Sequence, residues 1–111
     1  SEEAVRKRTV FVGPPGSIYE DVLATYEEDL DEFIASQGMV DTEAQGRDAL
    51  EEGRADVVVI FPEDPETKVL QGERAEIRVI HGEIDPLQRL AVEVAARLVV
   101  ERVQRRVVLV P

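Results

Sequence analysis

The residues that decide the fold are 50–86, which read LEEGRADVVVIFPEDPETKVLQGERAEIRVIHGEIDP. Residues 57–61 of this stretch are five large apolar side chains in a row, most of them β-branched. A run without polar alternation is typical of a strand covered on both faces, so it predicts a central strand. Residues 75–80 instead alternate between apolar and charged side chains, which predicts a half-exposed strand nearer the edge of the sheet.

Helix signals surround these two strands. Thr42 and Gln45 form a capping box, which predicts a short helix that ends at Gly53. An aspartate followed by a proline suits the cap and first turn of another short helix over residues 64–70, and Gly72 stops it.

Towards the N-terminus, residues 1–8 are polar and charged, and we expect a flexible tail or linker there. Residues 9–12 predict a first strand, and residues 13–16 (GPPG) force a turn. Ser17 and Glu20 form a second capping box, which predicts that a helix begins directly after this turn.

This first helix is predicted to continue to about Gly38, which is a plausible C-terminal stop. Its apolar side chains recur at spacings of three and four, at Ile18, Val22, Leu23, Tyr26, Leu30, Phe33 and Ile34. Residues 39–40 predict a weak second strand.

The last and longest helix is predicted to begin at Asp85 and Pro86 and to run to about Arg106. Its core-facing stripe is predicted to contain Leu87, Leu90, Ala91, Val94, Leu98 and Val103. Its solvent-exposed face is predicted to carry a series of charged side chains at Arg89, Glu93, Arg97, Glu101 and Arg105. Residues 107–110 could form a final strand or begin a further segment.

The element order is therefore β-α-β-α-β-(short α)-β-α. Alternating strands and helices predict one α/β domain over residues 9–111, with a mostly parallel sheet of four to five strands and helices packed against it. With 111 residues, the chain has room for one core.

Composition narrows the possible partners and sites. Lys and Arg number 13 and Asp and Glu number 24, which gives a net charge of −11, so nucleic acid is a poor partner. The absence of cysteine excludes disulfides and thiolate metal sites. No run of about 18 apolar residues is present that would predict a membrane span.

No single residue or motif is a strong candidate for catalysis or ligand binding. His81 is the single histidine and is expected to be a surface residue at a strand end. Residues 13–17 lie where phosphates often bind, but they lack a phosphate-loop lysine, and two prolines remove amide donors. The carboxylates of residues 27–32 match no calcium-loop spacing, and the serines at positions 1, 17 and 36 lack a nucleophile context. We therefore expect no enzyme and no catalytic, cofactor-binding or metal-binding residues.

Residues 50–86 also carry an ordered series of structural motifs. First, a short helix ends in Leu-x-x-Gly. A small residue and an aspartate then precede an apolar strand that ends in Ile-x-Pro. A second helix ends in Leu-x-Gly, and an alternating strand is followed by an Asp-Pro turn. The residues concerned are Leu50, Gly53, Ala55, Asp56, Ile60, Pro62, Leu70, Gly72, Ile77, Val79, Asp85 and Pro86. This series resembles the extracytoplasmic domain of bacterial type-2 ATP-binding-cassette (ABC) permeases, including the sodium and multidrug exporter branches.

The resemblance implies a non-catalytic domain on the extracytoplasmic side of the cell membrane that contributes to substrate passage, gating or permease pairing. It implies as partners the rest of the permease and a second permease copy, and the ATP-binding subunit only indirectly. An insert between two membrane helices should begin and end on the same side of the domain. The alternative is a stand-alone ligand-binding or sensory domain, with its ligand at the carboxyl ends of the strands.

Overall fold

The computed structural model describes residues 6–63 and 76–109. Their elements, in chain order, are β1 (Arg8–Val12), α1 (Ile18–Thr25), α2 (Glu27–Leu30), β2 (Ala35–Val40), α3 (Glu43–Glu51), β3 (Val57–Ile60), β4 (Arg78–His81) and α5 (Pro86–Leu109). The predicted short helix over residues 64–70 and its stop at Gly72 lie outside the described residues.

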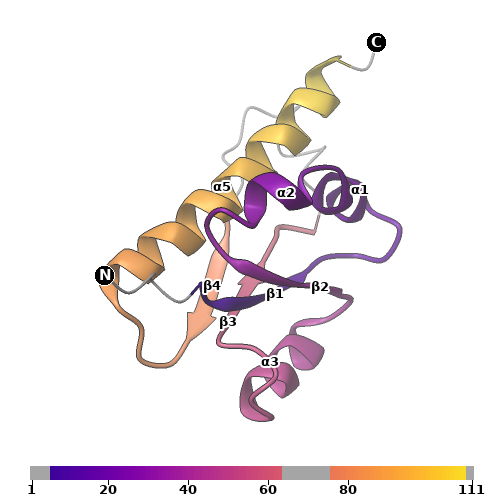
Figure 1. The fold of residues 1–111 in the computed structure, drawn as a ribbon. Helices are drawn as coiled ribbons and strands as arrows, with labels where there is room; N and C mark the ends of the chain where they lie inside the picture. The colour runs from indigo at the N-terminus through magenta and orange to yellow at the C-terminus, as the bar shows by residue number, and fades with distance from the viewer. Residues whose placement is uncertain (1–5, 64–75, 110–111) are drawn as a thin grey trace.

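The strands form one four-stranded sheet in the order β2-β1-β3-β4 (Figure 1). β1 pairs in parallel with β2 and β3, whereas β4 pairs antiparallel with β3. The chain therefore forms a single α/β domain with a mostly parallel sheet, which confirms the predicted fold class.

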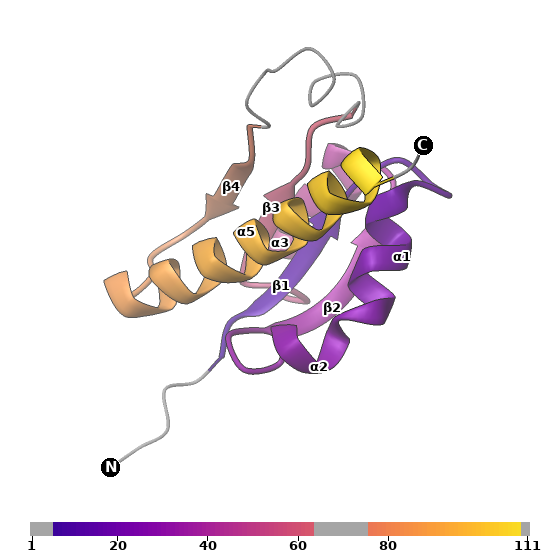
Figure 2. The same ribbon diagram turned by 90° about the horizontal axis from the view of Figure 1, so that it is seen from above.

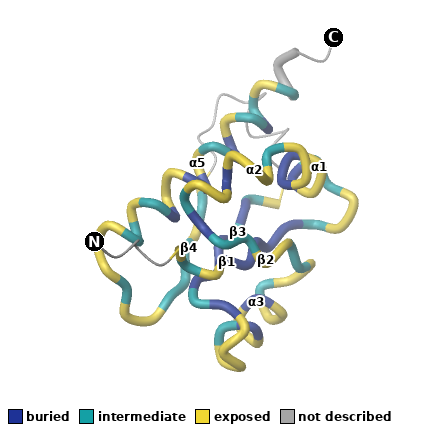
Figure 3. The backbone as a smooth tube through the Cα atoms, viewed as in Figure 1, coloured by how far each residue is buried: buried dark blue, intermediate teal, exposed yellow. Residues whose placement is uncertain are grey.

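Helices cover both faces of the sheet. α1, α2 and α5 lie on one face and α3 lies on the other (Figures 1 and 2). Val57 and Val59 join the core under α1 and α5, and Val58 is fully buried as well. Val57, Val58 and Val59 of β3 are thus all buried, because helices pack on each side of the sheet (Figure 3). The apolar run of residues 57–61 is confirmed as a central strand.

The prediction of one long first helix was wrong. α1 ends at Thr25, the backbone of Tyr26 leaves helical geometry at φ −108°, and α2 adds only four residues. The break places Glu27, Glu28 and Asp29 in the first turn of a new helix, where the helix dipole favours carboxylates. β2 then begins at Ala35, well before the predicted residues 39–40.

The first predicted capping box forms only in part. Ser17 is the N-cap of α1, but its side chain makes no capping hydrogen bond, and Glu20 accepts instead from the amide of Gly16. The second box is confirmed, since Thr42 accepts from the Gln45 amide and Gln45 accepts from the Thr42 amide.

Gly38 is not a helix stop but part of a β-bulge in β2. Thr9 pairs with Ser36, while Phe11 pairs with Met39, so β2 carries one extra residue between the two pairs. Gly38 has φ +87°, a conformation that glycine adopts without steric cost. The bulge explains how an exposed Gln37 and Gly38 interrupt an otherwise half-buried strand.

The predicted buried face of the last helix was wrong in part. The residues of α5 that are buried against the sheet are Val92, Ala95, Ala96, Val99, Val100 and Val103. Of the predicted stripe, Val103 is buried, but Leu87, Leu90 and Val94 are exposed by 74%, 54% and 40%. Ala91 and Leu98 are partly buried, and Leu98 packs against the core. α5 continues to Leu109, so residues 107–109 are helical and form no final strand.

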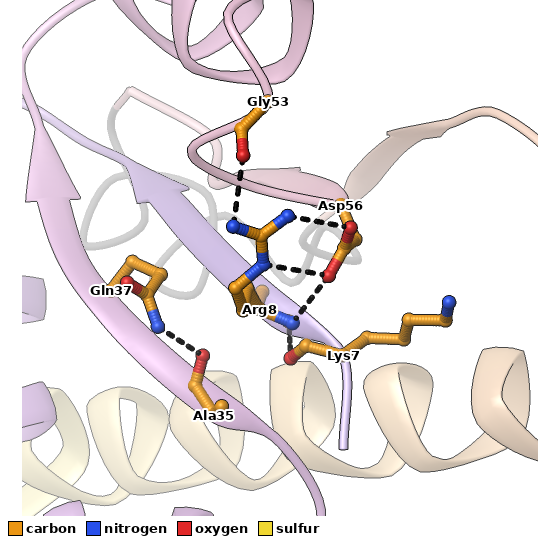
Figure 4. A network of polar contacts seen from close by, with 7 residues as sticks. Lys7, Arg8, Ala35, Gln37, Gly53 and Asp56 are labelled. Carbon is orange, nitrogen blue, oxygen red and sulfur yellow. Dashed lines mark hydrogen bonds and ion pairs between the residues drawn. The ribbon is translucent and has the colours of Figure 1, made fainter. Parts of the chain in front are cut away.

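A polar network fixes the start of β1 to the start of β3 (Figure 4). The Asp56 carboxylate accepts hydrogen bonds from Arg8 Nε and Nη2 at 3.1 and 3.0 Å, and from the Arg8 amide at 3.1 Å. Arg8 Nη1 also donates to the carbonyl of Gly53 at 2.8 Å. Gly53 and Asp56 of the motif series thus have a structural role at the amino edge of the sheet.

The two ends of the described chain lie at opposite poles. Lys7 lies beside Ile84 and Asp85, next to the start of α5, whereas Arg106 at the other end of α5 pairs with Asp21 of α1. Figure 2 shows β1 beginning on the side of the domain where α5 starts, whereas α5 ends on the other side. The expectation that both ends lie on one side was wrong, because antiparallel β4 returns the chain to the amino edge before α5 crosses the domain.

Candidate functional site

A hollow of about 740 Å³ opens at the carboxyl edge of the sheet. All four strands contribute to it, because β1, β2 and β3 end there and antiparallel β4 begins there. Its lining consists of Val12, Gly13, Pro14, Pro15, Asp41, Thr42, Glu43, Ile60, Phe61, Pro62, Glu63, Glu76 and Arg78.

The topology explains why the hollow lies at this point. From β1 the chain passes through α1 and α2 to β2 on one side, and α3 then carries it across to β3 on the other side of β1. The strand order therefore reverses direction between β1 and β3. In open α/β sheets, ligands bind at such switch points, outside the carboxyl ends of the strands.

The floor of the hollow is a rigid aromatic stack. The Phe61 ring lies parallel to the Tyr19 ring at a centroid distance of 4.4 Å and to the Phe11 ring at 5.5 Å. The Tyr19 hydroxyl donates to the carbonyl of Pro62 at 3.0 Å, which ties α1 to the loop after β3. Tyr19 and Phe11 are fully buried, so the floor is preorganised by the core.

One wall of the hollow is an ion-pair group centred on Glu43. Arg78 Nη1 donates to Glu43 Oε1 at 2.7 Å, and Arg47 Nε donates to Glu43 Oε2 at 2.9 Å. The hydrogen bonds from Arg78 and Arg47 lower the pKa of Glu43. Glu43 is thus held as a carboxylate, and the pair joins the start of α3 to β4 across the hollow.

Three backbone amides at the rim are already engaged. The amides of Asp41 and Thr42 both donate to Gln45 Oε1 at 3.0 Å, and the amide of Gly13 donates to the carbonyl of Val40 at 3.1 Å. The side chains of Asp41, Glu63 and Glu76 are exposed at this edge. A surface with bonded amides and carboxylates disfavours phosphates, and it can accept hydrogen bonds from a neutral or cationic ligand.

Of the residues that the sequence offered as candidates for binding or catalysis, only residues 13–15 line this hollow. His81 is half-buried at the end of β4, where it contacts Arg89 and the carbonyl of Gly82. Glu27, Glu28 and Asp29 are exposed on α2, on a different part of the surface. Sequence reasoning missed Asp41, Glu43 and Arg78; the signal that marks them is their position directly beside a strand end.

Two features are absent from the described ranges, 6–63 and 76–109. In these ranges no three His, Cys, Asp or Glu side chains gather closely enough to hold a metal ion. Nor does any helix there have the length and apolar character needed to cross a membrane.

Comparison with known proteins gives one structural match. It is a crystal structure described as "a domain of a putative ABC type-2 transporter from Thermotoga maritima MSB8", with a TM-score of 0.57 and 11% sequence identity. The match covers 95% of this chain and 73% of the other. The two chains share a fold. No protein-family model and no curated protein matches the sequence.

Proposed function

We propose that this chain is a non-catalytic, extracytoplasmic domain of an ABC-type exporter permease. In that role it contributes to substrate passage, to gating or to the pairing of two permease copies. The observation that carries the proposal is the fold shared, over 95% of this chain, with a domain of a transporter of that description. The motif series in residues 50–86 supports it independently, because it was identified from sequence alone.

The structure explains what those motifs do. Gly53 has φ +74° and ends α3, Asp56 binds Arg8, and Asp85 caps α5 by accepting from the amide of Leu87 at 2.8 Å. All three act on the fold and none contributes a reactive group.

The test uses the complete gene product in its own membrane. We expect an apolar span of about 20 residues on each side of this domain. A phosphatase reporter that is active only outside the cytoplasm, placed after Gly82, should be active, and a fluorescent reporter that requires the cytoplasm should be dark. The ATP-binding subunit should copurify with the full permease. A gene product with no flanking span would contradict the proposal.

The two ends of the described chain lie on opposite sides of the domain, which favours a second candidate, a stand-alone ligand-binding or sensory domain. An insert would need its N-terminal connection to run the length of the domain, whereas a stand-alone domain has no such requirement. The hollow at the switch point gives this candidate a site. Titration of the isotopically labelled domain with small amines, amino acids and sugars tests it: saturable NMR shifts confined to Thr42, Phe61 and Arg78 would support it.

A further inference from the structure

The outward face of α5 carries an apolar stripe, most of which nothing in the described part of the chain covers. We define the stripe by Leu87, Leu90, Val94 and Leu98, which recur at spacings of three and four. The first three are exposed by 74%, 54% and 40%, and Leu98 is partly buried where the stripe meets the core. Because the opposite face of the same helix is buried in the core, α5 has two apolar faces, and one of them meets water. A large exposed apolar patch on a helix usually marks an interaction surface.

The stripe is bordered by charges that are incompletely paired. Glu93, Arg97 and Glu101 line the same shallow hollow as Leu90, Val94 and Leu98. Glu93 pairs with Arg89 at 3.0 Å and Glu101 pairs with Arg105 at 3.2 Å, each on the side away from Arg97. Within the described ranges Arg97 has neither an ion pair nor a hydrogen bond. A cation that no described residue pairs with therefore lies beside the apolar stripe.

These border charges are complementary to those of a second, identical helix that lies antiparallel to the first. Two identical helices related by a two-fold axis near Ala95 place residue 93 of each copy opposite residue 97 of the other. Glu93 Oε1 is bonded to Arg89, and its second oxygen is available to accept from Arg97 of the other copy. The same axis places Val94 of each copy between Val94 and Leu98 of the other, and Leu98 of each copy between Leu90 and Val94 of the other, so the apolar side chains interdigitate beside the ion pairs.

We infer that the outward face of α5 pairs with the same face of a second copy of this chain, antiparallel, with Glu93–Arg97 ion pairs on both sides of Val94. The stripe spans about 16 Å from residue 87 to residue 98 at 1.5 Å per residue. Such a contact is smaller than the roughly 800 Å² per partner of a standard interface, so the isolated domain should form a weak dimer. The inference deepens the pairing role proposed above, but it rests on this helix surface alone.

Cysteine cross-linking tests the contact, because the chain contains no native cysteine. We expect Val94→Cys to form a disulfide-linked dimer under mild oxidation, whereas Ala44→Cys, which is exposed on α3 on the opposite face of the sheet, should not. Mixing Leu90→Cys and Leu98→Cys chains should give more mixed dimer than either gives alone. A parallel arrangement would reverse that last result and overturn the antiparallel pairing.

Charge reversal tests the ion pairs by sedimentation at concentrations up to about 1 mM. We expect Glu93→Arg to weaken dimerisation about tenfold, and Glu93→Arg with Arg97→Glu to restore it to within about threefold. Leu90→Glu should abolish the dimer, while circular dichroism shows that the fold is retained. A wild-type monomer at these concentrations, or failure of the double reversal to restore the dimer, would overturn the inference and leave the transporter proposal standing.

A lipid surface is the rival occupant. Vesicles of phosphatidylcholine with phosphatidylglycerol provide the probe, with the wild-type domain and Leu90→Glu compared. Binding that is lost in Leu90→Glu, together with a monomer in solution, would assign the stripe to a membrane and overturn the pairing.

Discussion

Arg8 and Asp56 hold each other through both side chain and backbone. The carboxylate of Asp56 accepts three hydrogen bonds from Arg8, and the amide of Asp56 donates to the Arg8 carbonyl at 2.8 Å. The two residues are 48 positions apart and stand at the starts of the two central strands. Their contact therefore sets the register of β1 against β3 from the amino edge.

The first prediction follows from the pKa of Asp56, which hydrogen bonds from Arg8 lower from the usual 3.8. A lowered pKa means that this carboxylate stabilises the fold above the unfolded-state pKa, and that its contribution is lost as the pH falls through the folded-state pKa. Asp56→Asn should lower the melting temperature on the order of 5 °C at pH 7, and this difference should shrink below about pH 4. Thermal melts between pH 2 and pH 7 measure it.

The matched control is Asp48→Asn on α3, an exposed aspartate whose side chain makes no interaction with any described residue. It should melt as the wild type does across the whole pH range. If Asp56→Asn and Asp48→Asn gave the same profile, the Arg8–Asp56 network would not contribute to stability.

The second prediction concerns Val59, which is fully buried in the centre of β3. Val59→Asp would bury an unpaired carboxylate and should cost about 3 kcal/mol or more, enough to leave much of the protein unfolded. Leu87→Asp makes the same chemical change at a site that is 74% exposed and should change stability by less than about 0.5 kcal/mol. Urea unfolding followed by circular dichroism compares the two variants. Comparable midpoints would show that residue 59 is not core.

The third prediction is that Gly46→Ala destabilises the protein, although alanine is the better helix former. A Cβ at position 46 would lie 2.8 Å from Val58 Cγ1 and 2.9 Å from Val12 Cγ2, so α3 would have to move off the sheet. We expect a loss of about 1–3 kcal/mol. Gly82→Ala, where no atom lies within 4 Å of the new Cβ, is the control and should be close to neutral. Stabilisation by Gly46→Ala would mean that α3 does not pack this closely.

The fourth prediction is that the domain does not bind nucleotides. The amides of Asp41 and Thr42 are bonded to Gln45, two prolines follow Gly13, and carboxylates surround the hollow. Calorimetric titration with ATP and Mg²⁺ should give no saturable binding tighter than about 100 μM, which corresponds to about −5.5 kcal/mol. A saturable isotherm below that value would show that the hollow accepts phosphates.

The fold class could be predicted because its signals are local. The unbroken apolar run of residues 57–61 indicated a strand buried on both faces, and Thr42 with Gln45 indicated where α3 begins. The first helix was misjudged because helical spacing continues through the turn after Leu30, where Phe33 and Ile34 pack inward from a non-helical backbone. The face of α5 was misjudged because apolar side chains surround that helix, and only the sheet decides which of them fit against it.

The candidate site could not be predicted from the sequence, for a different reason. Glu43 and Arg78 are 35 positions apart in sequence and meet only because the strand order is 2-1-3-4 with β4 reversed. The spacing of these residues in the sequence does not predict the strand order. The sequence could predict ligand binding at the strand ends as an alternative, but not which side chains would be there.

The bulge at Gln37 and Gly38 has a consequence for aggregation. β2 ends the sheet on one side, and among the described residues no strand pairs with its outer edge. A straight, flat edge is a template on which strands of other chains can add, one after another, into fibres. The extra residue bends β2 and breaks its repeat after two or three positions, so an incoming strand finds no continuous ladder to join. We therefore expect this domain to resist fibril growth through β2 even when it is crowded, and removal of Gly38 to make it prone to fibrils.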